Sequence, residues 1–423
     1  MSGQAREAAV KAREASRVLS SKTESERNTA LQAMANFLRE KAQFICEQNS
    51  QDMVQAKEKG VEKPLLDRLF LDEARIEAMA RSLEDLASLA DPIGCIQEER
   101  ELYNGLMLKR VSVPLGVVAM VYEARPNVTA DAAGICIKSG NACVLRGGSL
   151  ALHSNIAIAN TLRDALSSVG FPPDCIIAIE STDRAVTDEL LKLHGLVDVL
   201  IPRGGAGLIQ HCVNEATVPV IETGVGNCHV YIHESADIPM ALNIITNAKT
   251  QRPGVCNACE SVLIDSALAP SAIAPLVSAL RCHEVKLHLD SMLYDLLKDQ
   301  ELLGEDCSIA SEKDWGEEYL DLEISIKVVN GVEEAIAHIN RYGTGHSEAI
   351  VAQDKNAIDA FYQGVDAAAV YANASTRFTD GGEFGLGAEI GISTQKLHVR
   401  GPFALEALTT YKYLIKGSGQ VRG

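Results

Sequence analysis

The sequence predicts an α/β fold with two doubly wound domains and a small additional β element. From about residue 114 onward, short apolar runs of strand length alternate with helical segments. A helix-rich stretch precedes this alternation, and a strand-like segment follows it. The 423 residues, 47% of them hydrophobic, are enough for two or three packed domains.

The first half combines a helical scaffold with the first set of strands. Residues 2–90 are rich in alanine and charged residues and carry leucines at helical spacing, which predicts successive amphipathic helices. The run 116–122 is continuously apolar, as expected of a buried parallel strand. Further elements are predicted as strands at 106–113, 142–145, 176–179, 197–201 and 218–221 and as a helix at 154–169.

The second half repeats the alternation and closes with one more strand. The predicted elements are a helix at 238–249, a strand from 261, a helix at 270–282, and strands at 324–329, 368–371 and 408–415. Because an isolated terminal strand needs a partner, we expect 408–415 to pair with 106–113, either within one chain or across subunits. The expected domains are a cofactor domain (1–100 and 114–234), a catalytic domain (235–397) and a small β oligomerisation element (101–113 and 398–423).

Charge and composition exclude several classes of protein. With 39 basic and 57 acidic residues, the net charge of −18 disfavours nucleic acid and anionic membranes as partners. No apolar run approaches the ~20 residues that cross a bilayer, and the N-terminus lacks a signal-peptide pattern. The eleven cysteines are scattered, and Cys136, Cys143 and Cys175 lie in apolar runs. These features favour a cytoplasmic protein with reduced cysteines.

Cys256 is the strongest candidate for a catalytic residue. It follows Gln-Arg-Pro-Gly-Val at 251–255, where Pro253 and Gly254 end the preceding helix and place the thiol on a loop. An ionised cysteine is a strong nucleophile toward carbonyl carbon. Cys256 and Cys259 also spell Cys-x-x-Cys, so a zinc site or a redox dithiol is an alternative. A zinc site needs a second ligand pair, and a thioredoxin-type pair begins a helix, whereas this one leads into a strand.

A glycine-rich turn is the best candidate for phosphate binding. Pro-Arg-Gly-Gly-Ala-Gly at 202–207 follows a predicted strand and opens a helix, so its N–H groups could approach an anion. A tight structural connection is the equally good alternative. Neither a P-loop nor a GxGxxG fingerprint follows a predicted strand.

The order of these motifs resembles the aldehyde dehydrogenase superfamily. Glu222-Thr223-Gly224 is similar to the glutamate-glycine motif that precedes the superfamily's catalytic cysteine. Two further segments are similar to consecutive superfamily strands, with arginine at 146 where many members carry lysine: 114–127 and 138–148.

Three other strings narrow the resemblance to the γ-glutamyl phosphate reductase family. They are Thr-Gln-Arg-Pro at 250–253, Thr-Gly-His-Ser-Glu at 344–348, and Ala-Ser-Thr-Arg-Phe-Thr-Asp-Gly-Gly at 374–382. The resemblance runs from the N-terminal helices to about residue 415. It implies NADPH-dependent reduction of L-glutamyl 5-phosphate to L-glutamate 5-semialdehyde with release of phosphate, the second step of proline synthesis. It also implies a separate glutamate kinase as supplier of the acyl phosphate, and a homo-oligomer.

The resemblance assigns roles to the catalytic residues. Cys256 would attack the acyl carbon and form a thioester, which hydride from the nicotinamide reduces. The amide of Asn127 would stabilise the oxyanion together with the N–H of Cys256, although a residue after proline can also simply form a turn. Glu222 matches a glutamate that activates water in aldehyde-oxidising relatives. Hydrolysis would waste the thioester here, so a structural role for Glu222 is the alternative.

The cofactor and substrate contacts follow from the same resemblance. Arg146 would pair with the 2′-phosphate of NADPH, and Gly204 and Gly205 would lie beside the pyrophosphate. Glu318 aligns loosely with a glutamate that holds the nicotinamide ribose; a solvated charge is the alternative.

For the substrate, Arg125, Arg252 and Arg377 are candidates to hold its anionic groups, or are ordinary surface arginines. His346 is interpreted as a structural histidine, and no metal is expected. Two other functions stay open: an aldehyde-oxidising dehydrogenase that uses Glu222 for hydrolysis, and a non-enzymatic thiol or metal-binding protein.

Overall fold

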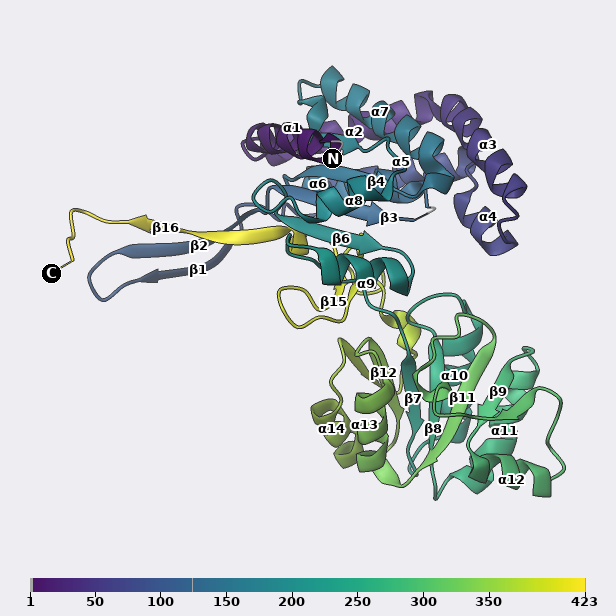
Figure 1. The fold of residues 1–423 in the computed structure, drawn as a ribbon. Coiled ribbons are helices and arrows are strands. Elements are labelled where there is room, and N and C mark those ends of the chain that lie inside the picture. The colour runs from purple at the N-terminus through teal and green to yellow at the C-terminus, as the bar shows by residue number, and fades with distance from the viewer. Residues whose placement is uncertain (1–2, 124, 423) are drawn as a thin grey trace. The chain divides into compact units, whose positions relative to one another are not determined.

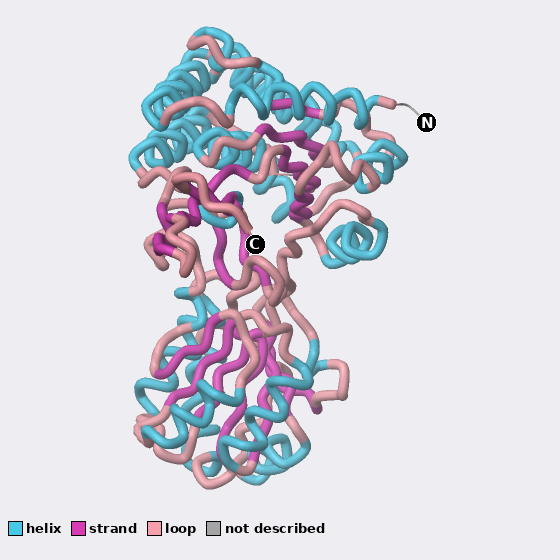
Figure 2. The backbone as a smooth tube through the Cα atoms, turned by 90° about the vertical axis from the view of Figure 1, so that its left-hand side faces the viewer, coloured by secondary structure: helices cyan, strands magenta, loops and turns pink. Residues whose placement is uncertain are grey.

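The chain folds into two compact units. The computed structural model describes residues 3–123 and 125–422. The first unit comprises Met1–Thr223, Leu386–Gly391 and Phe403–Gly423, and the second comprises Gly224–Gly385 and Ile392–Pro402. Strands form the inner layer of each unit and helices cover both faces (Figures 1 and 2). This arrangement confirms the predicted α/β class.

A parallel four-stranded sheet in the order β5-β4-β3-β6 forms the centre of the first unit. One face packs on α1, α8 and α9, and α6 and α7 pack against β4 and β5. The strands are β3 Val117–Tyr122, β4 Ala142–Gly147, β5 Ile176–Ala178 and β6 Val199–Arg203. The helices are α1 Gln4–Leu19, α2 Glu24–Glu40, α3 Ala42–Glu58, α4 Lys63–Leu69, α5 Glu73–Ser88, α6 Asn127–Lys138, α7 Leu152–Ser168, α8 Arg184–Leu191 and α9 Ala206–Glu215.

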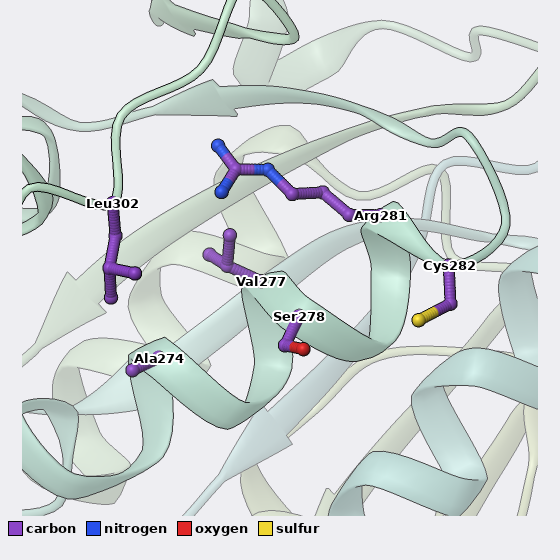
Figure 3. Close-up of a pocket in the computed structure, with 6 residues that line it drawn as sticks. All are labelled: Ala274, Val277, Ser278, Arg281, Cys282 and Leu302. Carbon is purple, nitrogen blue, oxygen red and sulfur yellow. The ribbon is translucent and has the colours of Figure 1, made fainter.

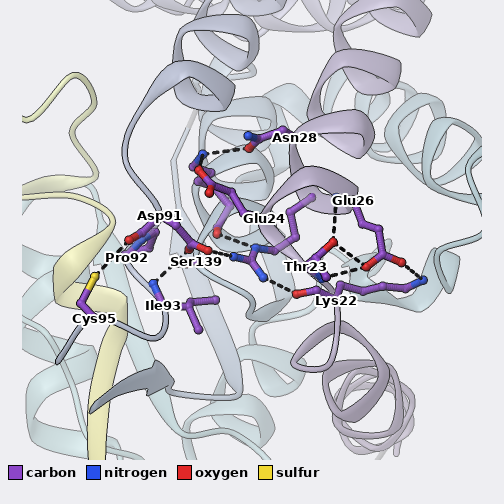
Figure 4. Close-up of polar contacts among 12 residues, drawn as sticks. Lys22, Thr23, Glu24, Glu26, Asn28, Asp91, Pro92, Ile93, Cys95 and Ser139 are labelled. Atoms are coloured by element: carbon purple, nitrogen blue, oxygen red, sulfur yellow. Dashed lines mark hydrogen bonds and ion pairs between the residues drawn. The ribbon is translucent and has the colours of Figure 1, made fainter. Parts of the chain in front are cut away.

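Buried cations fix the N-terminal helices to α6. Arg27 is 2% exposed, and its Nη2 lies 2.6 Å from Oδ2 of Asp91. Its Nε donates to the carbonyl of Lys138 at 3.1 Å, and the Nζ of Lys138 donates to Oδ1 of Asn28 at 2.8 Å. Figure 4 shows the side chains of Asn28 and Asp91 in this network. A buried charge is tolerated only when it is paired and hydrogen-bonded, so these contacts tie the scaffold helices to the sheet unit.

A parallel seven-stranded sheet in the order β10-β9-β11-β8-β7-β12-β13 forms the second unit. One face packs on α10, α11 and α12, and the other on α13 and α14. The strands are β7 Cys228–Ile232, β8 Cys259–Asp265, β9 Lys286–Leu289, β10 Cys307–Ile309, β11 Glu323–Val329, β12 Ser347–Val351 and β13 Ala369–Ala372. The helices are α10 Ile238–Thr250, α11 Ala269–Arg281, α12 Ser291–Asp299, α13 Gly331–Tyr342 and α14 Lys355–Gly364.

The remaining strands form two smaller sheets. β16 Thr409–Lys416 pairs antiparallel with β2 Met107–Pro114, which pairs with β1 Ile96–Glu101. The expected pairing of the last strand with 106–113 therefore occurs within one chain, and the three-stranded sheet projects from its unit (Figure 1). β14 Gly391–Ser393 and β15 Gly401–Phe403 form a two-stranded sheet.

Two sequence-based expectations differ from the structure. The segment 218–221 is not a strand: it makes a single bridge, between Val220 and Leu200, because Pro219 has no N–H with which to continue the ladder. The second unit begins at Gly224 rather than at 235, because β7 already belongs to its sheet, paired with β8 and β12.

Candidate active site

Cys256 lies on the loop that joins α10 to β8. The turn at Pro253 and Gly254 follows the end of α10 at Thr250, as the sequence predicts. Cys256 is half-buried, whereas Cys259 is fully buried as the first residue of β8. Burial raises the pKa of the Cys259 thiol to about 12, so this sulfur keeps its proton. Only Cys256 of this pair is presented at the surface of the unit.

A buried ion pair closes the base of this loop. The Nζ of Lys249, near the end of α10, lies 2.6 Å from Oε2 of Glu260, the second residue of β8. Both side chains are 0% exposed. Burial raises the pKa of Glu260 to about 7 despite the lysine. The pair joins the two chain segments from which the cysteine loop leaves.

The loop is also held by the segment that follows β13. The hydroxyl of Thr376 donates to the carbonyl of Asn257 at 2.8 Å, and the Asn257 amide donates to the carbonyl of Thr379 at 2.9 Å. Asn257 is 4% exposed. The residue after the nucleophile is therefore fixed through both its backbone and its side chain.

Two of the three expected substrate arginines lie beside Cys256. The Nε of Arg377 donates to Oε1 of Gln251 at 2.8 Å. Burial lowers the pKa of Arg377, the positive charge of Arg252 lowers it further, and the Cys256 thiol is among the groups that raise it. The structure thus brings Arg252, Arg377 and Cys256 together in the second unit. Arg125 belongs to the first unit, where it is exposed.

The carboxylate of Glu318 is hydrogen-bonded to the backbone of its own unit. Its Oε1 accepts a hydrogen bond from the N–H of Gly226 at 2.7 Å. Burial raises the pKa of this carboxyl, with the Gly226 bond and Lys249 opposing the shift. Glu318 is half-buried and hydrogen-bonded, so its carboxylate is not a fully solvated surface charge.

His346 is a buried, neutral histidine. Its Nδ1 lies 2.8 Å from the hydroxyl of Ser347, and its Nε2 has no hydrogen-bond partner among the described residues. Burial lowers the pKa of the imidazole to about 4. Only Nδ1 of the ring is therefore hydrogen-bonded among the described residues, and the structural role of His346 stays an interpretation.

Asn127 is the first residue of α6 and is exposed. Its amide donates to Oδ2 of Asp131, one helical turn later, at 3.0 Å. Burial of the Asp131 carboxyl raises its pKa to about 6, while Asn127 and Arg203 oppose the shift. Because an amide NH₂ carries two donors, the bond to Asp131 uses one and orients the other.

The glycine-rich turn lies between β6 and α9 and already holds an anionic group. The N–H of Gly205 donates to Oε2 of Glu123 at 3.0 Å. A Cβ at Gly204 would meet the same carboxyl group at 2.7 Å. The helix terminus therefore fits an anion, as expected for the phosphate of a nucleotide.

Arg146 is the second feature that fits a phosphorylated nucleotide. Its Nη1 and Nη2 donate to the carbonyls of Gly147 (2.9 Å) and Thr182 (3.1 Å), and its buried Nε has no partner among the described residues. Burial lowers the pKa of this guanidinium, and the charge of Arg184 lowers it further. The charge of Asp183 opposes both effects. The buried Nε that lacks a partner is the feature that suits a phosphate here.

Glu222 is half-buried at the end of the first unit. The chain beside it is anchored to β6, since the hydroxyl of Thr223 donates to the carbonyl of Pro202 at 2.9 Å. Glu222 itself takes part in polar contacts.

Other features of the described residues do not form a second site. A hollow of about 330 Å³ on α11 is lined by Ala274, Val277, Ser278, Arg281, Cys282 and Leu302 (Figure 3). The guanidinium of Arg281 is paired with Asp306, with 2.6 Å between Nε and Oδ2. In the described ranges, His, Cys, Asp and Glu form no group of three that could hold a metal. Nor does any described helix have the length and apolar character needed to span a membrane.

Sequence reasoning missed several residues of the site. They are Glu123 at the glycine-rich turn, Asp131 beside Asn127, Thr376, which binds the cysteine loop, Gly226, which precedes β7, and Cys228, which begins β7. A residue four positions after Asn127 on a helix could have been found from spacing alone. The others meet their partners through the sheet, which local sequence does not record.

Comparison with known proteins settles the family. A model of the aldehyde dehydrogenase family matches residues 2–293. The γ-glutamyl phosphate reductase of Lachnospira eligens is 54% identical over 98% of both chains. That of Caldanaerobacter subterraneus subsp. tengcongensis is 51% identical over the same shares. The chain belongs to the γ-glutamyl phosphate reductase family. It is therefore an oxidoreductase of the aldehyde dehydrogenase superfamily, as its motifs indicate.

Solved structures agree with this membership. The γ-glutamyl phosphate reductase of Thermotoga maritima superposes with a TM-score of 0.96 and is 45% identical, covering 99% of this chain and 100% of that one. An acetylating aldehyde dehydrogenase of Geobacillus thermoglucosidasius, 20% identical, has a TM-score of 0.68 and covers 99% and 97% of the two chains. The second similarity concerns the fold alone. Both agree with the aldehyde-dehydrogenase-like architecture of this γ-glutamyl phosphate reductase family member.

Proposed function

We propose that the protein reduces L-glutamyl 5-phosphate to L-glutamate 5-semialdehyde with NADPH and releases phosphate, the second step of proline synthesis from glutamate. The observation that carries this proposal is a half-buried cysteine on a loop closed by a buried ion pair, in a γ-glutamyl phosphate reductase family member. We infer the substrate from the names of the relatives and the covalent mechanism from the cysteine.

Cys256 performs the covalent chemistry. Its thiolate attacks the acyl carbon, the carbon–oxygen bond to phosphate breaks, and a thioester remains. A thioester stays electrophilic, and a thiolate leaves easily from the thiohemiacetal that follows its reduction. When bound, the reduced nicotinamide supplies the hydride. The N–H of Cys256 and the amide of Asn127 are the proposed oxyanion donors, and removal of one such donor typically raises the barrier by ~2.7–4 kcal/mol.

Arginines and glycines hold the two anionic molecules. For the cofactor we propose Arg146 at the 2′-phosphate and Gly204 and Gly205 at the pyrophosphate. The carboxylate of Glu123 marks the anion position at this turn and must yield it to a phosphate. Glu318 is the proposed contact to the nicotinamide ribose; its Oε1 is already engaged, so Oε2 would make that bond.

The substrate carries an ammonium group, a carboxylate and an acyl phosphate. We propose Arg252 and Arg377, which lie beside Cys256, as the main cations for its anionic groups. Arg125 is a further candidate. A guanidinium binds a carboxylate or phosphate through two parallel hydrogen bonds, which orients as well as attracts it.

The cellular setting follows from the same reaction. We propose a cytoplasmic enzyme that receives its acyl phosphate from a separate glutamate kinase. We also propose a homo-oligomer that uses the sheet of β1, β2 and β16. Along β16 every residue from Thr410 to Lys416 is exposed, including Tyr411, Tyr413, Leu414 and Ile415. An exposed apolar edge strand favours pairing with another chain.

The direct test is NADPH oxidation coupled to a glutamate kinase. Wild type, Cys256→Ala and Cys259→Ala are compared at equal enzyme concentration. We expect Cys256→Ala to abolish turnover, because it removes the thiol that forms the thioester. Cys259→Ala should retain it, because that thiol is buried in β8. Turnover by Cys256→Ala, or stoichiometric zinc in a protein without NADPH turnover, would overturn the proposal.

Glu222 provides a separate prediction. A reductase gains nothing from activating water, so Glu222→Gln should retain much of the wild-type kcat for NADPH oxidation. Cys256→Ala assayed in parallel defines complete loss. If Glu222→Gln falls as far as Cys256→Ala, the structural role is wrong and the carboxylate takes part in the chemistry.

A further inference from the structure

The segment Gly226-Asn227-Cys228, which leads into β7, contacts the backbone of the nucleophile at two points. A Cβ built on Gly226 would overlap the carbonyl oxygen of Cys256, so only glycine fits there. The Sγ of Cys228 donates to the same carbonyl oxygen at 3.2 Å. The main-chain carbonyl of Cys256 is therefore enclosed by one glycine and one thiol of the neighbouring strand.

This segment is itself fixed by surrounding loops. The N–H of Gly226 donates to Oε1 of Glu318 at 2.7 Å, and the N–H of Asn227 donates to the hydroxyl of Thr344 at 3.1 Å. The Asn227 side chain is 0% exposed and donates to the carbonyls of Trp315 (2.8 Å) and Tyr342 (3.0 Å). The contacts on Cys256 thus come from a segment with little freedom to move.

Cys228 carries a proton to donate. The residue is 0% exposed, and burial raises the pKa of its thiol well above the ordinary value, with the charge of Glu348 next in effect. A ring nitrogen, Nδ1 of His346, lies 3.7 Å from the sulfur. A neutral thiol is a weak donor in water, but this bond is partly buried, which reduces the competition from solvent.

We propose that Cys228 is a positioning residue for the reaction: its thiol holds the carbonyl of Cys256 against Gly226 and so sets the backbone orientation of the nucleophile. The peptide after Cys256 is planar, and Thr376 fixes the next carbonyl along the chain. Two anchored carbonyls determine the direction of the Cys256 side chain and of the N–H groups around it. The inference rests on the proposed role of Cys256 as nucleophile.

Three variants separate hydrogen bonding from packing. Cys228→Ser keeps a donor, Cys228→Val keeps bulk without a donor, and Cys228→Ala removes both. Cys175→Ser, at a buried thiol of the first unit, is the matched control. For each we measure kcat and KM for NADPH oxidation, the thermal midpoint, and the rate of iodoacetamide alkylation at Cys256. Alkylation is followed by mass spectrometry of the Cys256 peptide, because other cysteines are exposed.

We expect the serine variant to stay within about threefold of wild type, since its hydroxyl replaces the donor. The valine and alanine variants should lose about tenfold in kcat and change the alkylation rate at Cys256, with KM and thermal midpoint close to those of wild type. The proposal is wrong if the valine and serine variants have equal kcat and alkylation rates, or if kcat falls only in proportion to the thermal midpoint. Alkylation needs no substrate, so it reports on positioning even if the proposed reaction is incorrect.

Glycine provides an independent test of the same contact. Gly226→Ala must displace the Cys256 carbonyl, so its kcat should fall at least as far as that of Cys228→Ala. Gly316→Ala is the control, because a Cβ there has no atom within 4 Å. A Gly226→Ala protein with wild-type kcat and alkylation rate would contradict the proposal. If Gly226→Ala does not fold, the three Cys228 variants test the proposal on their own.

Discussion

Cys256 and Cys259 lie three positions apart and have opposite environments. Cys256 is half-buried on a loop, and Cys259 is buried in β8 with its thiol donating to the carbonyl of Ser261. The sequence distinguishes them because Pro253 and Gly254 end a helix just before the first. It could not reveal Cys228, whose contact with Cys256 depends on the pairing of β7 with β8. Loop residues are therefore predictable here, and the residues that support them are not.

The buried imidazole of His346 should make the stability of the folded protein depend on pH. The folded protein holds the pKa of its imidazole at about 4, against 6.5 when unfolded. Between these values the unfolded chain binds a proton that the folded chain does not, so stability is lost as pH falls below 6.5. The full effect is about 3 kcal/mol. His346→Gln should therefore show a smaller drop in thermal midpoint from pH 7 to pH 5 than wild type.

The buried His338 is retained in that variant and accounts for part of the remaining drop, since burial also lowers its pKa, to about 3. Equal drops in wild type and His346→Gln would show that His346 is not the source of the acid sensitivity.

At the scale of elements, the cysteine loop depends on the ends of α10 and β8. Lys249 and Glu260 join those ends through a fully buried ion pair. The sequence places both residues next to the loop but gives no sign that a lysine in a helix and a glutamate in a strand turn inward together. Elements themselves were more predictable: α10, α11 and β11 lie within a residue or two of their expected bounds. The strand β1 was missed because its residues are polar and exposed, without an apolar period.

Removing one member of the ion pair should be costly. Lys249→Met leaves the buried Glu260 carboxyl without its partner, so the folded protein must bury an unpaired charge or bind a proton there. We expect a loss of about 3–5 kcal/mol in the free energy of unfolding at pH 7. The double variant Lys249→Met/Glu260→Leu removes both charges and should recover most of that loss. Urea unfolding followed by circular dichroism measures the difference. The loss in the single variant should be smaller at pH 5, because the unfolded chain, in which the pKa of Glu260 is 4.5, then also begins to bind the proton that the folded variant carries. Equal losses in the single and double variants would show that the charges do not interact.

At the scale of the whole molecule, the alternation of strands and helices was enough to predict two α/β units. The division of the chain between them was less predictable, since it depends on which sheet each strand joins. β7 belongs to the second sheet, and the chain returns to the first unit at Leu386 and again at Phe403. Such returns depend on long-range pairing, for which one sequence carries no local signal. The pairing of β16 with β2 was foreseeable because a terminal strand needs a partner.

The central claim is that water does not hydrolyse the Cys256 thioester. In the forward direction hydride reduces it, and in the reverse direction phosphate accepts its acyl group. The most direct measurement runs the reaction in reverse, with L-glutamate 5-semialdehyde and NADP⁺, with and without inorganic phosphate. We predict that NADPH formation depends strictly on phosphate and disappears in Cys256→Ala. NADPH formation without phosphate, with glutamate as the product, would contradict the account and identify an aldehyde-oxidising dehydrogenase instead.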